Sequence, residues 1–268
     1  MILLVVEDNP TDLMLLQARL HHSFPKARIM YADDPHQLKE SLKCDNCDVV
    51  VTDYWLGWTD GLSVLQRVRE RWPRVRVIFL TGNGGEEVVA GAFKYGIYHY
   101  LLKPDGFDEI TAVAGAAFES KRREDAHELM ARIVESFPSG VHSVSPAGTI
   151  IAINAAARAL YGYADDQIIG RSFEALLPAG LRDKHRLLHE QALAGEVVPR
   201  FPTVNLRRDG TEVASAMTMV PIRGADGGVL CVAYIANPIA DVDAAASADS
   251  RPERSALASA RQPTESAD

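Results

Sequence analysis

The stretch ILLVVED, residues 2–8, is a short apolar run that ends in two acidic residues. The same pattern returns in VVVTD, residues 49–53, where an apolar run ends in Asp53. A run of four to eight apolar residues bounded by polar ones is typical of a strand buried on both faces, as in a parallel sheet. The two stretches therefore predict parallel strands that end next to Glu7, Asp8 and Asp53.

Further strands and helices alternate along the first 122 residues. Apolar runs of strand length are separated by segments whose apolar residues recur with helical spacing, and this alternation predicts a doubly wound α/β fold around a five-stranded parallel sheet. The first helix is expected to begin at an N-cap formed by Thr11. The strands are expected at residues 2–6, 27–31, 49–52, 75–80 and 98–102, and the helices at residues 11–24, from 35, 61–72, 86–95 and from 105.

Polar side chains stand where four of these strands end. In addition to the acidic residues, Thr81 and Lys103 close two of the later apolar runs. Ligands of open α/β sheets bind at the carboxyl ends of the strands, so these groups are expected to share one shallow acidic cleft. Carboxylates, a hydroxyl and an ammonium suit a hard divalent cation and a phosphoryl group.

Four segments in this region resemble the receiver domain of bacterial response regulators, which is a chemotaxis-response-regulator-like domain with flavodoxin-like strand order. They are VVEDNPTD, VVVTDYWLGWTDGL, VIFLTGNG and YHYLLKPD, and the resemblance covers residues 1–122. It implies that Asp53 accepts a phosphoryl group from a phosphohistidine of a sensor histidine kinase or phosphotransfer protein. It also implies a Mg²⁺ site formed by Asp8, Asp53 and the Trp55 carbonyl, with Glu7 acting through water.

The same resemblance implies roles for three more positions. Thr81 and Lys103 would hold the phosphoryl oxygens, and Tyr100 would rotate when Thr81 moves. The Lys103-Pro104 bond is expected to be cis. One departure is visible: most receivers carry Pro-Gly after the phosphoacceptor loop, where this chain has Gly57-Trp58.

Composition limits the remaining classes of protein. A length of 268 residues suits two domains, and a net charge of −8 argues against a surface that binds nucleic acid. No apolar run approaches the length of a membrane span, and three cysteines fit a reducing, cytoplasmic location. Cys44 and Cys47 form a CxxC without a second pair, so a loop before the third strand is favoured over metal or redox chemistry.

Residues 123–136 are polar and favour a helix, so a helical linker is predicted to continue the fifth helix. His127-Glu128-Leu129 looks like the start of a histidine-kinase phosphoacceptor box, but Met130-Ala131-Arg132 follows in place of the expected residues. His127 is therefore interpreted as an exposed helix residue.

Residues 137–238 resemble a PAS domain, an α+β module with an antiparallel sheet that can enclose a small cavity. The strands are expected at residues 141–145, 149–154, 198–207, 213–220 and 229–236, with turns at Asp209-Gly210 and at residues 226–228. The segments that carry the resemblance are SGVHSVSPAGTIIAINAAARALYGY, IIGRSFEALLP and LRRDGTEVASAMTMVPIRGADGGVLCVAYIAN.

The ligand of this second domain stays unknown. Light-sensing flavin relatives carry a reactive Cys after the Gly-Arg of the connecting helix, whereas Ser172 follows Gly170-Arg171 here. His185 and His189 lie on the helix expected over residues 181–194, but no His follows that helix where haem relatives place their ligand. Neither haem nor flavin is favoured, and protein contact or homodimerisation is the expected role.

Residues 239–268 are rich in Ala, Ser, Asp and Arg and are expected to be a disordered tail. The favoured function is a two-component phosphorelay response regulator that catalyses only its own phosphorylation and dephosphorylation. Two alternatives stay open: a ligand-sensing PAS module whose receiver docks a kinase constitutively, and a fragment of a hybrid histidine kinase or cyclase.

Overall fold

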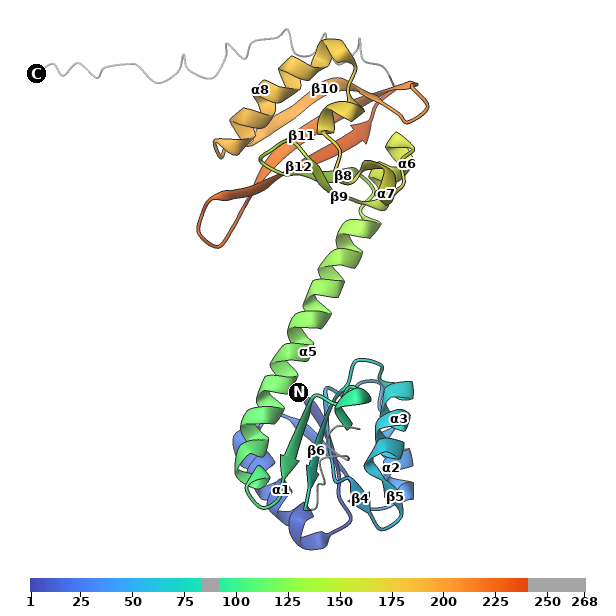
Figure 1. The fold of residues 1–268 in the computed structure, drawn as a ribbon, viewed down its shortest axis with the longest axis vertical. Helices are drawn as coiled ribbons and strands as arrows, with labels where there is room; N and C mark the ends of the chain where they lie inside the picture. The colour runs from blue at the N-terminus through green and yellow to red at the C-terminus, as the bar shows by residue number, and fades with distance from the viewer. Residues whose placement is uncertain (83–91, 241–268) are drawn as a thin grey trace, which may run out of the picture. The chain divides into compact units, whose positions relative to one another are not determined.

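The computed structural model describes residues 1–82 and 92–240. The chain divides into two compact units, Met1–Leu129 and Met130–Asp268 (Figure 1).

The first unit is built on a parallel sheet of five strands in the order β2-β1-β3-β6-β7, which confirms the predicted class of fold. The register pairs Val6 with Thr52 and Thr52 with Phe79, so the carboxyl ends of the central strands lie along one edge. The strands are β1 (Ile2–Val6), β2 (Arg28–Ala32), β3 (Val49–Thr52), β6 (Arg76–Thr81) and β7 (His99–Leu102).

Helices cover both faces of this sheet (Figure 1). On one face lie α1 (Pro10–Ser23) and α5 (Gly106–Ser136), which bury Leu16, Leu20 and Ile110 against the strands. On the other face lie α2 (Pro35–Ser41) and α3 (Gly61–Arg71), which bury Leu38 and Val64. Burial of each such side chain stabilises the fold by about 1.5–3 kcal/mol.

Two local predictions for this unit were wrong or lie outside the described residues, and one hairpin was not predicted. The first helix begins at Pro10 and is capped by Asn9, not by Thr11, because the Asn9 side chain accepts the backbone N–H groups of Thr11 and Asp12 and Pro suits the first helical position. A two-residue hairpin, β4 (Trp55–Leu56) and β5 (Thr59–Asp60), was not predicted. The helix predicted over residues 86–95 lies largely outside the described residues.

Helix α5 is continuous over the predicted linker, as its lack of Gly and Pro after Gly115 indicated. The two units divide between Leu129 and Met130, within this helix. His127 is exposed on it. The domain boundaries proposed from the sequence stay predictions.

The second unit contains an antiparallel sheet of five strands, as predicted, and the strands follow the order β10-β11-β12-β8-β9. Gly210 and Gly227, in the turns of the two long hairpins, both have φ of 82°, a conformation that glycine adopts without strain. The strands are β8 (Gly140–Val144), β9 (Ile150–Ile153), β10 (Val198–Leu206), β11 (Glu212–Arg223) and β12 (Val229–Pro238).

Short helices cover one face of this sheet. Met219 and Tyr234 of the sheet pack against Tyr161, Phe173 and Ala192 of the covering segments. These segments are α6 (Ala155–Tyr161), α7 (Asp165–Ile168), the 3₁₀ turns η1 (Phe173–Leu176) and η2 (Ala179–Leu181), and α8 (Arg182–Leu193).

The predicted tail over residues 239–268 falls almost entirely outside the described residues. Within the described ranges, none of the helices combines the length and the apolar character that crossing a membrane would require.

Candidate functional site

The polar residues predicted at the strand ends do lie at one edge of the parallel sheet. Glu7 directly follows β1, Asp53 follows β3, Thr81 is the last residue of β6 and Lys103 follows β7. The position of each follows from the parallel register, which brings the ends of the strands into line. The Lys103-Pro104 peptide bond is cis, as expected.

The Lys103 ammonium is the centre of the site. Its Nζ donates to Glu7 Oε2 at 2.8 Å, to Asp12 Oδ2 at 2.7 Å and to Asp53 Oδ2 at 2.8 Å. Asp12 was missed by the sequence analysis, although it stands in the first turn of α1, directly after a strand that points at this edge.

Burial and the neighbouring charges shift the pKa values of this cluster in opposite directions. Burial alone would lower the pKa of Lys103, but its hydrogen bonds to Asp12, Asp53 and Glu7 outweigh this and the pKa is raised. Lys103 is therefore a cation at neutral pH. Burial raises the pKa of Glu7, in spite of the opposing effect of Lys103.

Backbone N–H groups orient the other two acidic side chains. Asp53 Oδ1 accepts the N–H of Trp55 at 3.0 Å, and Asp8 Oδ2 accepts the N–H of Gly57. A Cβ atom at Gly57 would lie 2.9 Å from Asp8 Oδ2, so a larger residue there would push the end of the Asp8 side chain aside. Gly57, where the chain departs from the receiver pattern, thus positions Asp8 through its backbone.

Two hydroxyl groups near the site are buried without a hydrogen-bond partner among the described residues. Thr81 Oγ1 belongs to a fully buried residue, and the Tyr100 hydroxyl lies on the next strand, β7. Burial, followed by the charge of Asp53, raises the pKa of Tyr100, so this hydroxyl stays protonated. A buried hydroxyl without a partner is costly, so an incoming acceptor oxygen would relieve the cost at Thr81.

The donor set of the site suits a hard cation. Its side chains offer only oxygen ligands, and the carboxylates of Glu7, Asp8, Asp12 and Asp53 outnumber the single ammonium of Lys103. In the described part of the chain, no three His, Cys, Asp or Glu side chains are already arranged as a metal cage. Oxygen-only donors with excess negative charge match the preferences of Mg²⁺, which keeps several of its waters.

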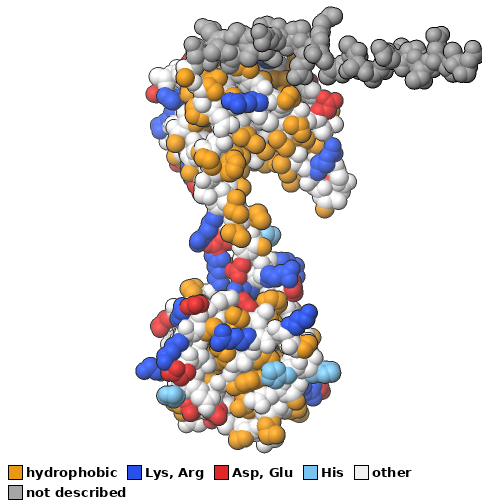
Figure 2. Space-filling model, turned by 180° about the vertical axis from the view of Figure 1, so that it is seen from behind, with side chains coloured by type: hydrophobic (Ala, Val, Ile, Leu, Met, Phe, Trp, Pro, Cys, Tyr) orange, Lys and Arg blue, Asp and Glu red, His pale blue; other side chains and the backbone are white. Residues whose placement is uncertain are grey.

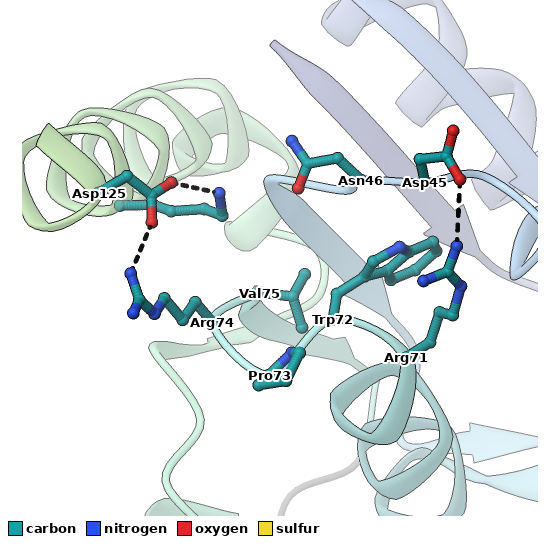
Figure 3. A pocket seen from close by; sticks show the side chains of 9 residues that line it. Asp45, Asn46, Arg71, Trp72, Pro73, Arg74, Val75 and Asp125 are labelled. Atoms are coloured by element: carbon teal, nitrogen blue, oxygen red, sulfur yellow. Dashed lines mark hydrogen bonds and ion pairs between the residues drawn. The ribbon is translucent and has the colours of Figure 1, made fainter. Parts of the chain in front are cut away.

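A second hollow, of about 460 Å³, lies near the amino ends of β3 and β6, away from Asp53 (Figure 3). Arg74 pairs there with Asp125 at 3.4 Å, and Lys121 Nζ donates to Asp125 at 2.6 Å. Lys121 also reaches Asp48 at 3.3 Å. Its charged groups pair with one another, and these ion pairs join α5 to the sheet.

Two histidines of α8 lie in the interior of the second unit. His185 and His189 are both buried, and they contact Thr203 Oγ1 at 2.7 Å and the Tyr234 hydroxyl at 3.0 Å. Burial lowers the pKa of His185 to about 4 and also lowers that of His189, so both rings are neutral near pH 7.

Cys44 and Cys47 lie in the loop between α2 and β3 and are free thiols. The Cys47 thiol donates to the Val49 carbonyl, and burial raises its pKa to about 12. A thiol with so high a pKa is a poor nucleophile and a poor metal ligand.

Comparison with known proteins defines both units. A family model described as "Response regulator receiver domain" matches residues 3–114, and a second, described as "PAS fold", matches residues 134–244. The chain thus carries a receiver domain of the response regulator family followed by a PAS domain.

Curated relatives resemble only part of the chain. "Hydrogenase transcriptional regulatory protein HoxA" of Cupriavidus necator is 30% identical over 137 residues, which are 50% of this chain and 28% of that protein. "Uncharacterized transcriptional regulatory protein YesN" of Bacillus subtilis is 32% identical over 97 residues, 36% of this chain and 26% of that protein. The chain spans about a quarter of the length of these relatives. Together with the two domains, the relatives support a two-component response regulator.

Two solved structures each resemble less than half of the chain. A response regulator receiver domain protein from Clostridium thermocellum is 26% identical, covers 45% of this chain and 96% of its own, and has a TM-score of 0.41. A PAS domain from Colwellia psychrerythraea is 21% identical, covers 42% of this chain and 97% of its own, and has a TM-score of 0.40.

Proposed function

We propose that the chain is a phosphorelay response regulator in which Asp53 accepts a phosphoryl group from a phosphohistidine. The observation that carries this proposal is the cluster at the sheet edge. One lysine there touches three carboxylates, one of them Asp53, and the buried Thr81 hydroxyl ends the neighbouring strand without a partner among the described residues.

In the proposed reaction an ionised Asp53 oxygen attacks the phosphorus atom. The P–O bond forms while the P–N bond to the donor imidazole breaks, and the electron pair of that bond stays with the leaving nitrogen. The product is an acyl phosphate on Asp53. Lys103 Nζ already lies 2.8 Å from Asp53 Oδ2, so it can hold a phosphoryl oxygen attached there with a charge-assisted hydrogen bond.

Thr81 would donate its hydroxyl hydrogen to a second phosphoryl oxygen. Movement of Thr81 toward the phosphoryl group would leave space for the Tyr100 ring, which is the switch that the resemblance to receivers implies. Asp8, Asp53, the Trp55 carbonyl and, through water, Glu7 would hold Mg²⁺, which offsets the charge spread over the transferred group.

Incubation of the full chain with acetyl phosphate and Mg²⁺, followed by intact-mass spectrometry, tests this proposal. The wild type is expected to gain the mass of one phosphoryl group, whereas Asp53→Asn and a sample treated with excess EDTA are not. Asp45→Asn, which alters an exposed aspartate in the loop before β3, should be modified like the wild type. Unmodified wild type would favour a receiver that docks a kinase constitutively.

The proposed output is protein contact through the PAS domain, in a cytoplasmic protein whose input partner is a histidine kinase or a phosphotransfer protein. Support for this comes from the continuous helix α5, which links residues of the first unit to residues of the second. Asn154 ties the end of that helix to the PAS unit, because its Nδ2 donates to the Val134 carbonyl at 3.0 Å.

A further inference from the structure

Asp12 is a partner of Lys103 that belongs neither to the predicted phosphoryl site nor to the predicted Mg²⁺ site. It is the third residue of α1 and stands in the first turn of that helix. Its Oδ2 accepts from Lys103 Nζ at 2.7 Å, and Glu7 and Asp53 accept from the same atom at 2.8 Å. Asp12 therefore shares the lysine on equal terms with the proposed phosphoacceptor.

All three donors of the Lys103 ammonium are in use. An ammonium has three N–H groups and no acceptor, and three carboxylate oxygens lie within hydrogen-bond distance of Nζ. A phosphoryl group that approaches Asp53 brings several anionic oxygens. While Asp53 is still unmodified, Lys103 can donate to one of these oxygens only by turning an N–H away from a carboxylate. The phosphoryl group and the carboxylates thus compete for Lys103.

Asp12 is held less firmly than the other two carboxylates. Glu7 has a second anchor, because its Oε1 accepts the Asn9 N–H at 3.1 Å. Asp53 has one as well, because its Oδ1 accepts the Trp55 N–H at 3.0 Å. Asp12 has no second anchor among the described residues, and its side chain is 23% exposed, against 1% for Glu7 and 11% for Asp53. Water can replace Lys103 at Asp12, so Asp12 is the partner that is displaced at least cost.

The start of α1 can hold Asp12 as a carboxylate after it has left Lys103. The dipole and the free N–H groups of a helix N-terminus favour negative charge in the first turn, and Asp12 follows the N-cap Asn9 by three positions. No proton has to move in the exchange. Asp12 stays ionised, and one N–H of Lys103 turns from the Asp12 carboxylate to a phosphoryl oxygen.

The effect of the Asp12 charge is local. On the face of the first unit that Figure 2 shows, Lys and Arg side chains lie among the Asp and Glu side chains. Salt at physiological ionic strength screens exposed charges over about 8 Å. Asp12, in contact with Lys103, therefore acts on an anion at the site more strongly than an exposed acidic residue elsewhere on the unit.

We propose that Asp12 competes with the phosphoryl group for Lys103 and thereby weakens the hold of the site on phosphoryl donors. Asp12 is a positioning residue, because it touches the lysine and not the transferred group. It has this role only if Asp53 is phosphorylated as proposed above, and it then sets the affinity with which that reaction begins.

Asp12→Asn tests the proposal, because the amide keeps the shape of the side chain and removes its charge. At saturating Mg²⁺, intact-mass time courses of the full chain should show an apparent KM for acetyl phosphate about fivefold lower, the factor that one partly exposed ion pair contributes. The maximal rate should change less, because the competition is removed equally before and during transfer. Calorimetric titration should show that beryllofluoride, a phosphoryl mimic, binds more tightly by a similar factor.

Three further variants serve as controls. Asp12→Ala also removes the charge and should bind beryllofluoride as tightly as Asp12→Asn. Asp12→Glu keeps the charge and should match the wild type. Asp45→Asn removes one exposed charge in the loop before β3 and should match the wild type as well. Damage to the fold would weaken the binding of beryllofluoride, whereas release of Lys103 strengthens it, so the direction of the change separates the two causes.

Equal or weaker binding of beryllofluoride in both Asp12→Asn and Asp12→Ala, together with a wild type that is phosphorylated, would overturn the role of Asp12 and leave the proposed function standing. A wild type that neither gains a phosphoryl group nor binds beryllofluoride would overturn both.

Discussion

At the scale of single residues, Lys103 holds together a cluster of like charges. Its ammonium is the shared partner of Glu7, Asp12 and Asp53, and it is largely buried. Removal of one partner of a buried ion pair leaves uncompensated charge and commonly costs about 3 kcal/mol. We therefore expect Lys103→Met to lower the free energy of unfolding by about this amount in urea titrations without Mg²⁺.

Mg²⁺ should restore part of the stability of Lys103→Met, because a bound cation would replace the missing charge. Lys39→Met, which alters an exposed lysine of α2, is the control and should change stability little. Equal stabilities of the two variants would show that the carboxylates around Lys103 do not repel one another in the folded state.

The sequence was informative about the residues that end strands and less so about those on helices. In a parallel sheet, residues that directly follow a strand lie at its carboxyl edge. This places Glu7-Asp8 after β1 and Asp53 after Val49–Thr52 at the same edge. Asp12 has no such signal, because its approach to Lys103 depends on where α1 begins. The cap assigned to Thr11, two residues beyond the true cap Asn9, obscured that start.

At the scale of elements, a belt of ion pairs joins α5 to the sheet beyond the segment that apolar contacts hold. Arg76 pairs with Glu124, and Arg74 pairs with both Asp125 and Glu128. Lys121 is the most buried member, and hydrogen bonds to Asp125 and Asp48 raise its pKa against the opposing effect of burial. The belt therefore fixes the part of α5 that follows Phe118, which packs partly buried against the core next to Ala117.

Loss of Lys121 is expected to loosen this part of α5. In Lys121→Met, amide hydrogen exchange over residues 119–129 should accelerate several-fold, because local opening no longer breaks the partly buried contacts of Lys121 with Asp125 and Asp48. Arg122→Met is the matched control, since Arg122 is the next residue on the helix and pairs at the surface with Glu119. Identical exchange in both variants would mean that Lys121 contributes nothing to holding the helix.

For helix α5, the sequence predicted the length of the helix but not its contacts with the sheet. Its continuity could be predicted, because no Gly or Pro interrupts residues 116–136. Its ion pairs could not, because Asp48 and Arg74 are far away in the sequence. The β4–β5 hairpin was missed for a simpler reason: strands of two residues have no detectable period.

At the scale of the whole molecule, the two units should differ in their response to acid. Burial lowers the pKa of His142 to about 3 and that of His185 to about 4, and both lie in the PAS unit. Their folded-state pKa values are below the unfolded value, so the unfolded chain binds protons first and stability is lost as the pH falls below about 6.5. Each group costs about 1.4 kcal/mol per pH unit in that range. Burial raises the pKa of Glu7 in the receiver, so the folded receiver binds this proton first and gains stability from Glu7 as the pH falls.

Urea unfolding at pH 7 and pH 5 can separate the units. The three tryptophans, Trp55, Trp58 and Trp72, all lie in the receiver, so their fluorescence follows that unit alone while circular dichroism follows both. We expect the dichroism transition to shift to lower urea at pH 5 more than the fluorescence transition. His142→Phe should reduce the shift and His127→Phe, at an exposed site on α5, should not. Equal shifts in both signals would contradict the assignment to the buried histidines.

The ion-pair belt of α5 makes the hold of the receiver on its own helix sensitive to salt. Arg74, Asp125 and Glu124 are well exposed, and salt screens ion pairs between exposed charges. The apolar contacts of Ile110 with the sheet carry no charge that salt could screen. Rising salt should therefore release the outer part of α5 while the sheet and its core stay intact.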